Sequence, residues 1–165
     1  MKILLVDDDK AVRDSMNKVL HDAGFEVVLA ADGQEAWERF DPNRIDLMLL
    51  DLDLPVCGGW ETFERITAHN PTLPIIVITG HTGQFDVAVQ AGVGAFMEKP
   101  LDVPRLLQTM RDLLAEPKEV RFQRLCGHRR DVRHIRACRQ EFLEKIRQQQ
   151  GTPYHPPRWG SDKRL

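Results

Sequence analysis

The sequence predicts an α/β fold, with a doubly wound, five-stranded parallel sheet that carries helices on both faces, followed by a helical C-terminal extension. Two observations support this prediction. Residues 1–116 alternate five times between a short apolar run and a stretch with helical periodicity, and such runs suit strands that are buried on both faces. Strands separated by helices also need crossover connections, which produce a parallel sheet with both sides covered.

The first two strands and their helices show the pattern clearly. The apolar run Ile3–Val6 ends at three aspartates, and residues 11–20 then carry apolar side chains at helical spacing. Residues 25–29 form the second predicted strand. Asp32 is placed to cap a short second helix that reaches Phe40.

Three more strand and helix pairs follow, in the order 45–50, 59–69, 73–78, 85–91, 95–98 and a final helix capped by Asp102. Right-handed crossovers are the strong default for such an alternation. In open sheets of this kind, the functional site lies beyond the carboxyl ends of the strands, where the strand order reverses. The residues that end each strand are therefore the first candidates for function.

Those strand-end residues are polar, and three of them are acidic: Asp7, Asp8, Asp51, Thr79 and Lys99. Carboxylates that meet at one edge repel one another unless cations compensate their charge. A hard divalent metal such as Mg²⁺, which prefers oxygen ligands, and the ammonium of Lys99 are the natural cations here.

This set of residues predicts phosphoryl chemistry. Asp51 is the candidate nucleophile, because a carboxylate can attack phosphorus and form an acyl phosphate. The metal and Lys99 would stabilise the charge that spreads over the transferring group. Thr79 can donate its hydroxyl to a phosphoryl oxygen.

The spacing of these residues also resembles that of a known family. The matching features are Asp7-Asp8 after the first strand, Asp51 with Pro55 and Gly59 at the fourth and eighth following positions, Thr79 after the fourth strand, Phe96 in the fifth strand and Lys99-Pro100 after it. Each match is weak alone, but together and in this order they are specific. Residues 1–116 thus resemble the receiver domain of bacterial two-component response regulators, of which chemotaxis receivers are an example.

The resemblance implies a flavodoxin-like sheet with strand order 2-1-3-4-5 and a cis peptide bond at Lys99-Pro100. It implies Mg²⁺ bound by the side chains of Asp8 and Asp51, by Asp7 directly or through water, and by the backbone carbonyl of Asp53. It also implies that Thr79 and Phe96 form the switch, with the aromatic ring turning inward as the threonine moves toward the phosphoryl group.

The function that the resemblance implies is a phosphorylation-activated response regulator. A sensor histidine kinase or a phosphotransfer protein would supply the phosphoryl group to Asp51, and the domain would signal by conformational change. It would not be an enzyme beyond catalysing its own phosphoryl transfer and autodephosphorylation. An alternative from another class is a phosphoaspartyl-type hydrolase, since Asp51-Leu52-Asp53 fits the Asp-x-Asp pattern of that class. The nucleophile of that class normally follows the first strand, however, and this chain has no room for its cap domain.

Composition indicates a cytoplasmic protein without a membrane segment. No apolar run approaches the length of about 18 residues that a span requires, and the N-terminus does not match a secretory signal. Three cysteines, Cys57, Cys126 and Cys138, are few and odd in number, so a disulfide framework is not expected.

The charge is distributed unevenly, which divides the chain into two predicted units. Residues 1–116 carry 10 basic and 20 acidic side chains, whereas residues 117–165 carry 13 basic and 5 acidic ones. The boundary is placed before Pro117, which cannot continue a helix without a break. Within the second unit, apolar residues recur every three or four positions between Asp131 and Gln149, which predicts a basic amphipathic helix.

Three interpretations of residues 117–165 remain open. The favoured one packs the apolar stripe on the receiver or pairs it with a second copy, giving a homodimer. The second is contact with nucleic acid through the arginines, which would make the chain a DNA-binding transcriptional regulator. The third is a zinc site from Cys126, His128, His134 and Cys138, whose spacing matches no familiar zinc finger.

Overall fold

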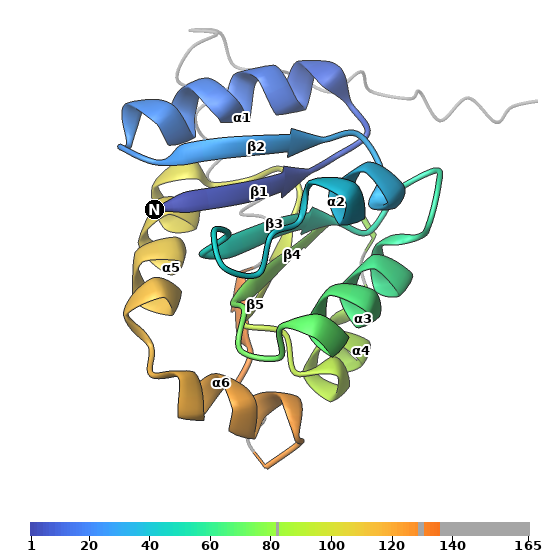
Figure 1. The fold of residues 1–165 in the computed structure, drawn as a ribbon, viewed down its shortest axis with the longest axis vertical. Helices are drawn as coiled ribbons and strands as arrows, with labels where there is room; N and C mark the ends of the chain where they lie inside the picture. The colour runs from blue at the N-terminus through green and yellow to red at the C-terminus, as the bar shows by residue number, and fades with distance from the viewer. Residues whose placement is uncertain (82, 129–130, 136–165) are drawn as a thin grey trace, which may run out of the picture.

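The computed structural model of the chain describes residues 1–81, 83–128 and 131–135 (Figure 1). Its centre is one parallel sheet in the order β2-β1-β3-β4-β5-β6. The strands are β1 (Lys2–Val6), β2 (Glu26–Ala30), β3 (Leu47–Asp51), β4 (Ile75–Thr79), β5 (Ala95–Glu98) and β6 (Arg133–Ile135). The predicted order of the first five strands is confirmed. The predicted number of strands was too small by one, because β6 extends the sheet beyond β5.

The helices are α1 (Lys10–Asp22), α2 (Gly33–Arg39), α3 (Gly59–His69), α4 (Phe85–Ala91), α5 (Val103–Ala115) and α6 (Lys118–Leu125). Helices α1 to α5 alternate with the strands as predicted, and α6, which the alternation did not include, follows α5 directly. Asp9, Asp32 and Asp102 each accept hydrogen bonds from backbone N–H groups in the first turn of a helix. These bonds satisfy donors that a helix start otherwise leaves open. None of the helices in the described ranges is long and apolar enough to cross a membrane.

The core consists of two layers, one on each face of the sheet. Successive side chains of a strand point to opposite faces, so Leu4 and Val6 pack with α2, α3 and α4, whereas Ile3 and Leu5 pack with α1 and α5. Every residue of β3 and β4 is buried. Full burial of one such aliphatic side chain stabilises the fold by about 1.5–3 kcal/mol, so the central strands hold the site in a rigid frame.

The C-terminal extension differs from its prediction. The helix expected from Asp131 to Gln149 is wrong at Arg133–Ile135, which form β6, and its remainder from 136 lies outside the described residues. The edge of β5 explains the difference, because an uncovered edge presents backbone N–H and C=O groups that only an extended segment can pair. The segment also fits a strand, since Val132 packs on one face of the sheet and Ile135 on the other.

Helix α6 packs beside the segments that precede β4 and β5. The guanidinium of Arg124 is 3% exposed and makes two hydrogen bonds to the carboxylate of Glu116, at 3.0 and 2.6 Å. Arg121 donates to the carbonyls of Leu113 and Leu114, which lie at the end of α5, and to that of Thr72. Helix α6 and strand β6 therefore each contact the first unit, and the division of the chain at residue 116 stays a prediction.

Candidate functional site

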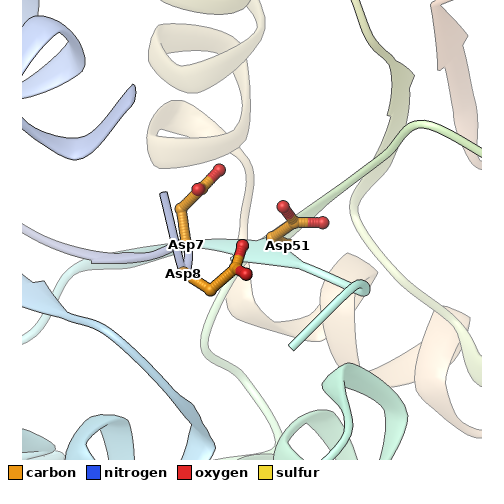
Figure 2. Close-up of side chains that lie close together, drawn as sticks. All are labelled: Asp7, Asp8 and Asp51. Carbon is orange, nitrogen blue, oxygen red and sulfur yellow. The ribbon is translucent and has the colours of Figure 1, made fainter. Parts of the chain in front are cut away.

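Three carboxylates meet at the carboxyl edge of the sheet. Asp7 directly follows β1 and Asp51 ends β3, and these strands are neighbours in the sheet. Figure 2 shows Asp7, Asp8 and Asp51 close together, and one oxygen of each lies within 4.8 Å of one oxygen of the others. Asp7 and Asp51 are buried, whereas Asp8 is exposed. The parallel sheet thus gathers acidic groups that are distant in sequence.

Lys99 brings a positive charge into this cluster. Its Nζ lies 2.5 Å from Oδ2 of Asp51 and 3.2 Å from Oδ2 of Asp7. Lys99 follows β5, so its side chain reaches past the end of β4 to the ends of β3 and β1. Its backbone N–H donates to the carbonyl of Thr79 at 2.8 Å, and the Lys99-Pro100 bond is cis, as expected.

The environment of the site shifts two pKa values. Burial raises the pKa of the Asp7 carboxyl above its usual value, although the Asp9 backbone N–H and Lys99 act in the opposite direction. Burial also works against the charge of the Lys99 ammonium, but hydrogen bonds and Coulomb attraction from Asp51 and Asp7 outweigh it and raise the pKa of Lys99. The raised pKa favours the charged form of Lys99 beside the two buried carboxylates.

Backbone donors orient the two buried carboxylates. Oδ1 of Asp7 accepts from the N–H of Asp9 at 2.9 Å, and Oδ1 of Asp51 accepts from the N–H of Asp53 at 3.0 Å. In both residues the other oxygen, Oδ2, faces Lys99. Each carboxylate is thus fixed by the turn that follows its strand, and Asp8 stands at the open side of the site.

Two of the predicted residues lie deeper in the sheet. Thr79 ends β4 and is fully buried, and its hydroxyl accepts a hydrogen bond from the N–H of His81 at 3.0 Å. Phe96 is also fully buried, with its ring 5.9 Å from that of Phe85. Thr79 thus stands at a strand end, whereas Phe96 lies within β5, and their roles as switch residues stay predictions.

Some contacts around the site were not foreseen. The side chain of Asp53, a residue whose backbone carbonyl is a predicted metal ligand, lies 3.2 Å from Nε2 of His81 and accepts from the N–H of Gly80. These contacts connect the loops after β3 and β4, and the adjacency of the two strands was the signal that could have indicated them. Cys126, His128 and His134 do not gather into a group of metal ligands in the part of the chain that the structure describes, and Cys138 lies outside it.

The fold and this constellation match one family. The family model of the response regulator receiver domain covers residues 3–111. The chain belongs to the response regulator receiver family. Among curated response regulators, the protein MprA of Mycobacterium avium is 36% identical over 120 residues, which are 72% of this chain and 53% of that protein. The chain thus spans about half the length of the curated relatives it matches.

Solved receiver structures agree with this assignment. The receiver domain protein of Methanospirillum hungatei, described as CheY-like, is 32% identical with a TM-score of 0.66, and the match covers 72% of this chain and 95% of that one. The receiver domain of a sensor histidine kinase of Pseudomonas aeruginosa is 29% identical with a TM-score of 0.62, over 70% of this chain and 98% of that one. The latter structure is described with a magnesium ion coordinated in its active site cleft.

Proposed function

We propose that the chain accepts a phosphoryl group on Asp51 from a phosphohistidine of a sensor histidine kinase or phosphotransfer protein, and signals through the resulting change in shape. The observation that carries this proposal is the pairing of a carboxylate that is 1% exposed with an ammonium 2.5 Å away, beside two further carboxylates. A buried nucleophile next to a cation is suited to group transfer, because the cation is already positioned to stabilise the charge on the transferring oxygens.

In the transfer step, a carboxylate oxygen of Asp51 forms a bond to phosphorus. The bond between phosphorus and the donor's imidazole nitrogen breaks, and its electron pair stays on that nitrogen, which takes up a proton. Lys99 stabilises the negative charge on the phosphoryl oxygens, and the backbone N–H of Asp53 keeps the carboxylate oriented. Later attack of water on phosphorus regenerates Asp51 and releases phosphate.

The donor set fits Mg²⁺. Three carboxylates and one ammonium leave an excess of negative charge when all are ionised, and oxygen atoms are the ligands that Mg²⁺ prefers. Asp8 and Asp51 would hold the ion, with Asp7 directly or through water and with the backbone carbonyl of Asp53. A bound Mg²⁺ would supply positive charge for the phosphoryl oxygens. The magnesium described in the Pseudomonas receiver supports this assignment.

Thr79 and Phe96 are proposed to transmit the change. A phosphoryl group on Asp51 offers new acceptors to the Thr79 hydroxyl, which now accepts from the His81 N–H. Phe96 would adjust its packing as Thr79 moves. The variant Thr79→Ala should therefore still bind beryllofluoride, an acyl-phosphate mimic, but lose the accompanying amide shifts around Phe96. Shifts around Phe96 that persist in this variant would show that the coupling runs elsewhere.

The proposal as a whole is tested by backbone amide NMR with Mg²⁺, before and after addition of beryllofluoride. We expect shifts around Asp51, Thr79 and Phe96, and we expect them to vanish when EDTA removes the metal. No response in residues 1–116 would show that the domain does not take phosphate. A phosphoaspartyl hydrolase would instead turn over a generic phosphomonoester, a reaction that we expect to be absent.

Binding of DNA by the extension, homodimerisation and a cytoplasmic location stay predictions from composition and charge. A phosphoaspartyl hydrolase fits the chain less well, since Asp51 ends the third strand rather than the first and the family match covers residues 3–111.

A further inference from the structure

The outer edge of β5 is occupied by the chain's own extension. Ala95, Phe96 and Met97 pair in parallel register with Arg133, His134 and Ile135. Strand β6 has only three residues, and all of them are half-buried. Such a short element, with few buried contacts, belongs to the least stable part of a structure and can open without general unfolding.

His134 contributes three side-chain contacts between this strand and the rest of the domain. Its ring stacks on Phe85 at 4.1 Å between centroids with an interplanar angle of 15°, and it meets Phe96 edge-on at 5.5 Å. Its Nε2 also lies 2.9 Å from Oε1 of Glu98. The histidine thus covers the ring of the proposed switch residue and bonds to the last residue of β5.

The contact with Glu98 connects β6 to the phosphorylation site. Glu98 pairs across the sheet with Thr79 and is followed directly by Lys99, whose ammonium contacts Asp51. Glu98 therefore stands between the two residues that must adjust when Asp51 gains a phosphoryl group. Lys99 has to make room for the group at the present 2.5 Å contact, and Thr79 has to turn toward it.

We propose that Arg133–Ile135 are an intramolecular latch, closed on β5 while Asp51 is unmodified and released when Asp51 carries phosphate. The inference rests on the proposed function, because the trigger is the phosphoryl group. The stacking of the His134 ring and its contact with Glu98 both depend on the present position of β5. Displacement of Thr79, which pairs with Glu98, and of Lys99, which follows Glu98, disturbs both contacts. Because so short a strand contributes little docking free energy, a small difference between the phosphorylated and unmodified states is enough to shift the fraction of molecules in which β6 is closed. Release uncovers Phe96 and the backbone groups of β5.

Linkage gives a second consequence. If phosphate weakens the latch, then weakening the latch must strengthen binding of a phosphate mimic, by up to the same factor. The variant His134→Ala removes the stacking and the Glu98 contact from a half-buried edge position, so the core stays intact. We expect it to bind beryllofluoride about fivefold or more tightly than the unaltered chain. His128→Ala is the matched control, because His128 is an exposed histidine of the same extension.

The experiment combines amide hydrogen exchange with a beryllofluoride titration on the full chain in Mg²⁺. We expect the amides of β6 to lose protection when beryllofluoride saturates Asp51, and the affinity to rise for His134→Ala but not for His128→Ala. If the β6 amides stay protected while beryllofluoride saturates the amide shifts around Asp51, the latch is overturned and the proposed function stands. This holds whether the strand stays paired within a monomer or is exchanged in a dimer. An unchanged or weaker affinity of His134→Ala would likewise overturn the latch alone. No amide shift around Asp51 on addition of beryllofluoride would overturn both the proposed function and the latch.

Discussion

At the carboxyl edge of the sheet, two buried carboxylates, Asp7 and Asp51, share the single ammonium of Lys99, whereas in α6 the buried guanidinium of Arg124 has carboxylate partners of its own. Asp7 has a raised pKa and lies beside a second buried carboxylate. By contrast, Arg124 has a two-bond partner in Glu116 and a second acidic group, Asp131, 3.5 Å from its Nε. Uncompensated charge favours binding of cations and phosphate, and paired charge favours a fixed structure. Substitutions should therefore separate function at the first region from stability at the second.

The largest expected effect is at the site. Asp51→Asn removes the nucleophile, so transfer of phosphate from a phosphohistidine donor and the response to beryllofluoride should both be lost completely. Acid-stable, base-labile radiolabelling and amide NMR measure the two responses. Asp14→Asn is the control, because Asp14 is an exposed carboxylate paired with Lys10 on α1. Residual labelling of Asp51→Asn would mean that another residue accepts the phosphate.

The next effect concerns the stability of the extension. Arg124→Ala leaves Glu116 buried without its partner, and breaking a buried pair in this way costs about 3–5 kcal/mol of unfolding free energy. Arg111→Ala, at an exposed position of α5, should change stability by less than about 0.5 kcal/mol. Urea unfolding monitored by circular dichroism measures both. A small loss for Arg124→Ala would show that α6 contributes little to the fold.

The pairing in that region can be tested further by replacing both partners. Arg124→Met combined with Glu116→Leu removes both charges while keeping apolar volume, so the double variant should be nearly as stable as the unaltered chain. This outcome would show that the stability lost in Arg124→Ala comes from the unpaired carboxylate of Glu116. An equal loss in the double variant would instead assign it to packing of α6.

A glycine beneath α6 sharpens the same comparison. Gly92 has φ +73°, and a Cβ there would lie 2.6 Å from Cα of Leu125 and 2.7 Å from the carbonyl oxygen of Arg124. Gly24 has φ +87° with nothing within 4 Å of such a Cβ. Gly24→Ala should therefore cost only the backbone strain, about 1–2 kcal/mol. Gly92→Ala should cost more unfolding free energy, because the added Cβ would also clash with the backbone of α6. The difference between the two variants measures the cost of that clash, and equal losses would mean that α6 moves away at no cost.

The two regions also differ in how far the sequence predicted them. The site could be predicted because each of its residues follows a short apolar run, and because parallel strands bring such positions to one edge. The strand at 133–135 could not be predicted, since Val132 and Ile135 at a spacing of three favour a helix, and the β5 edge that converts them to a strand is distant in sequence. The sequence left contact with nucleic acid open for the arginines of the extension, and only the tertiary fold shows Arg124 buried on Glu116.

The smallest expected effect returns to the site and isolates the metal. Asp8 is exposed, so Asp8→Asn should change the unfolding free energy by less than about 0.5 kcal/mol. The variant nevertheless removes one charged ligand, and the dissociation constant of Mg²⁺ should rise about tenfold. Asp9→Asn makes the same change in net charge one residue away, and Asn caps a helix as well as Asp does. If NMR titration showed equal weakening in both variants, Asp8 would act through the general field of the site and not as a ligand.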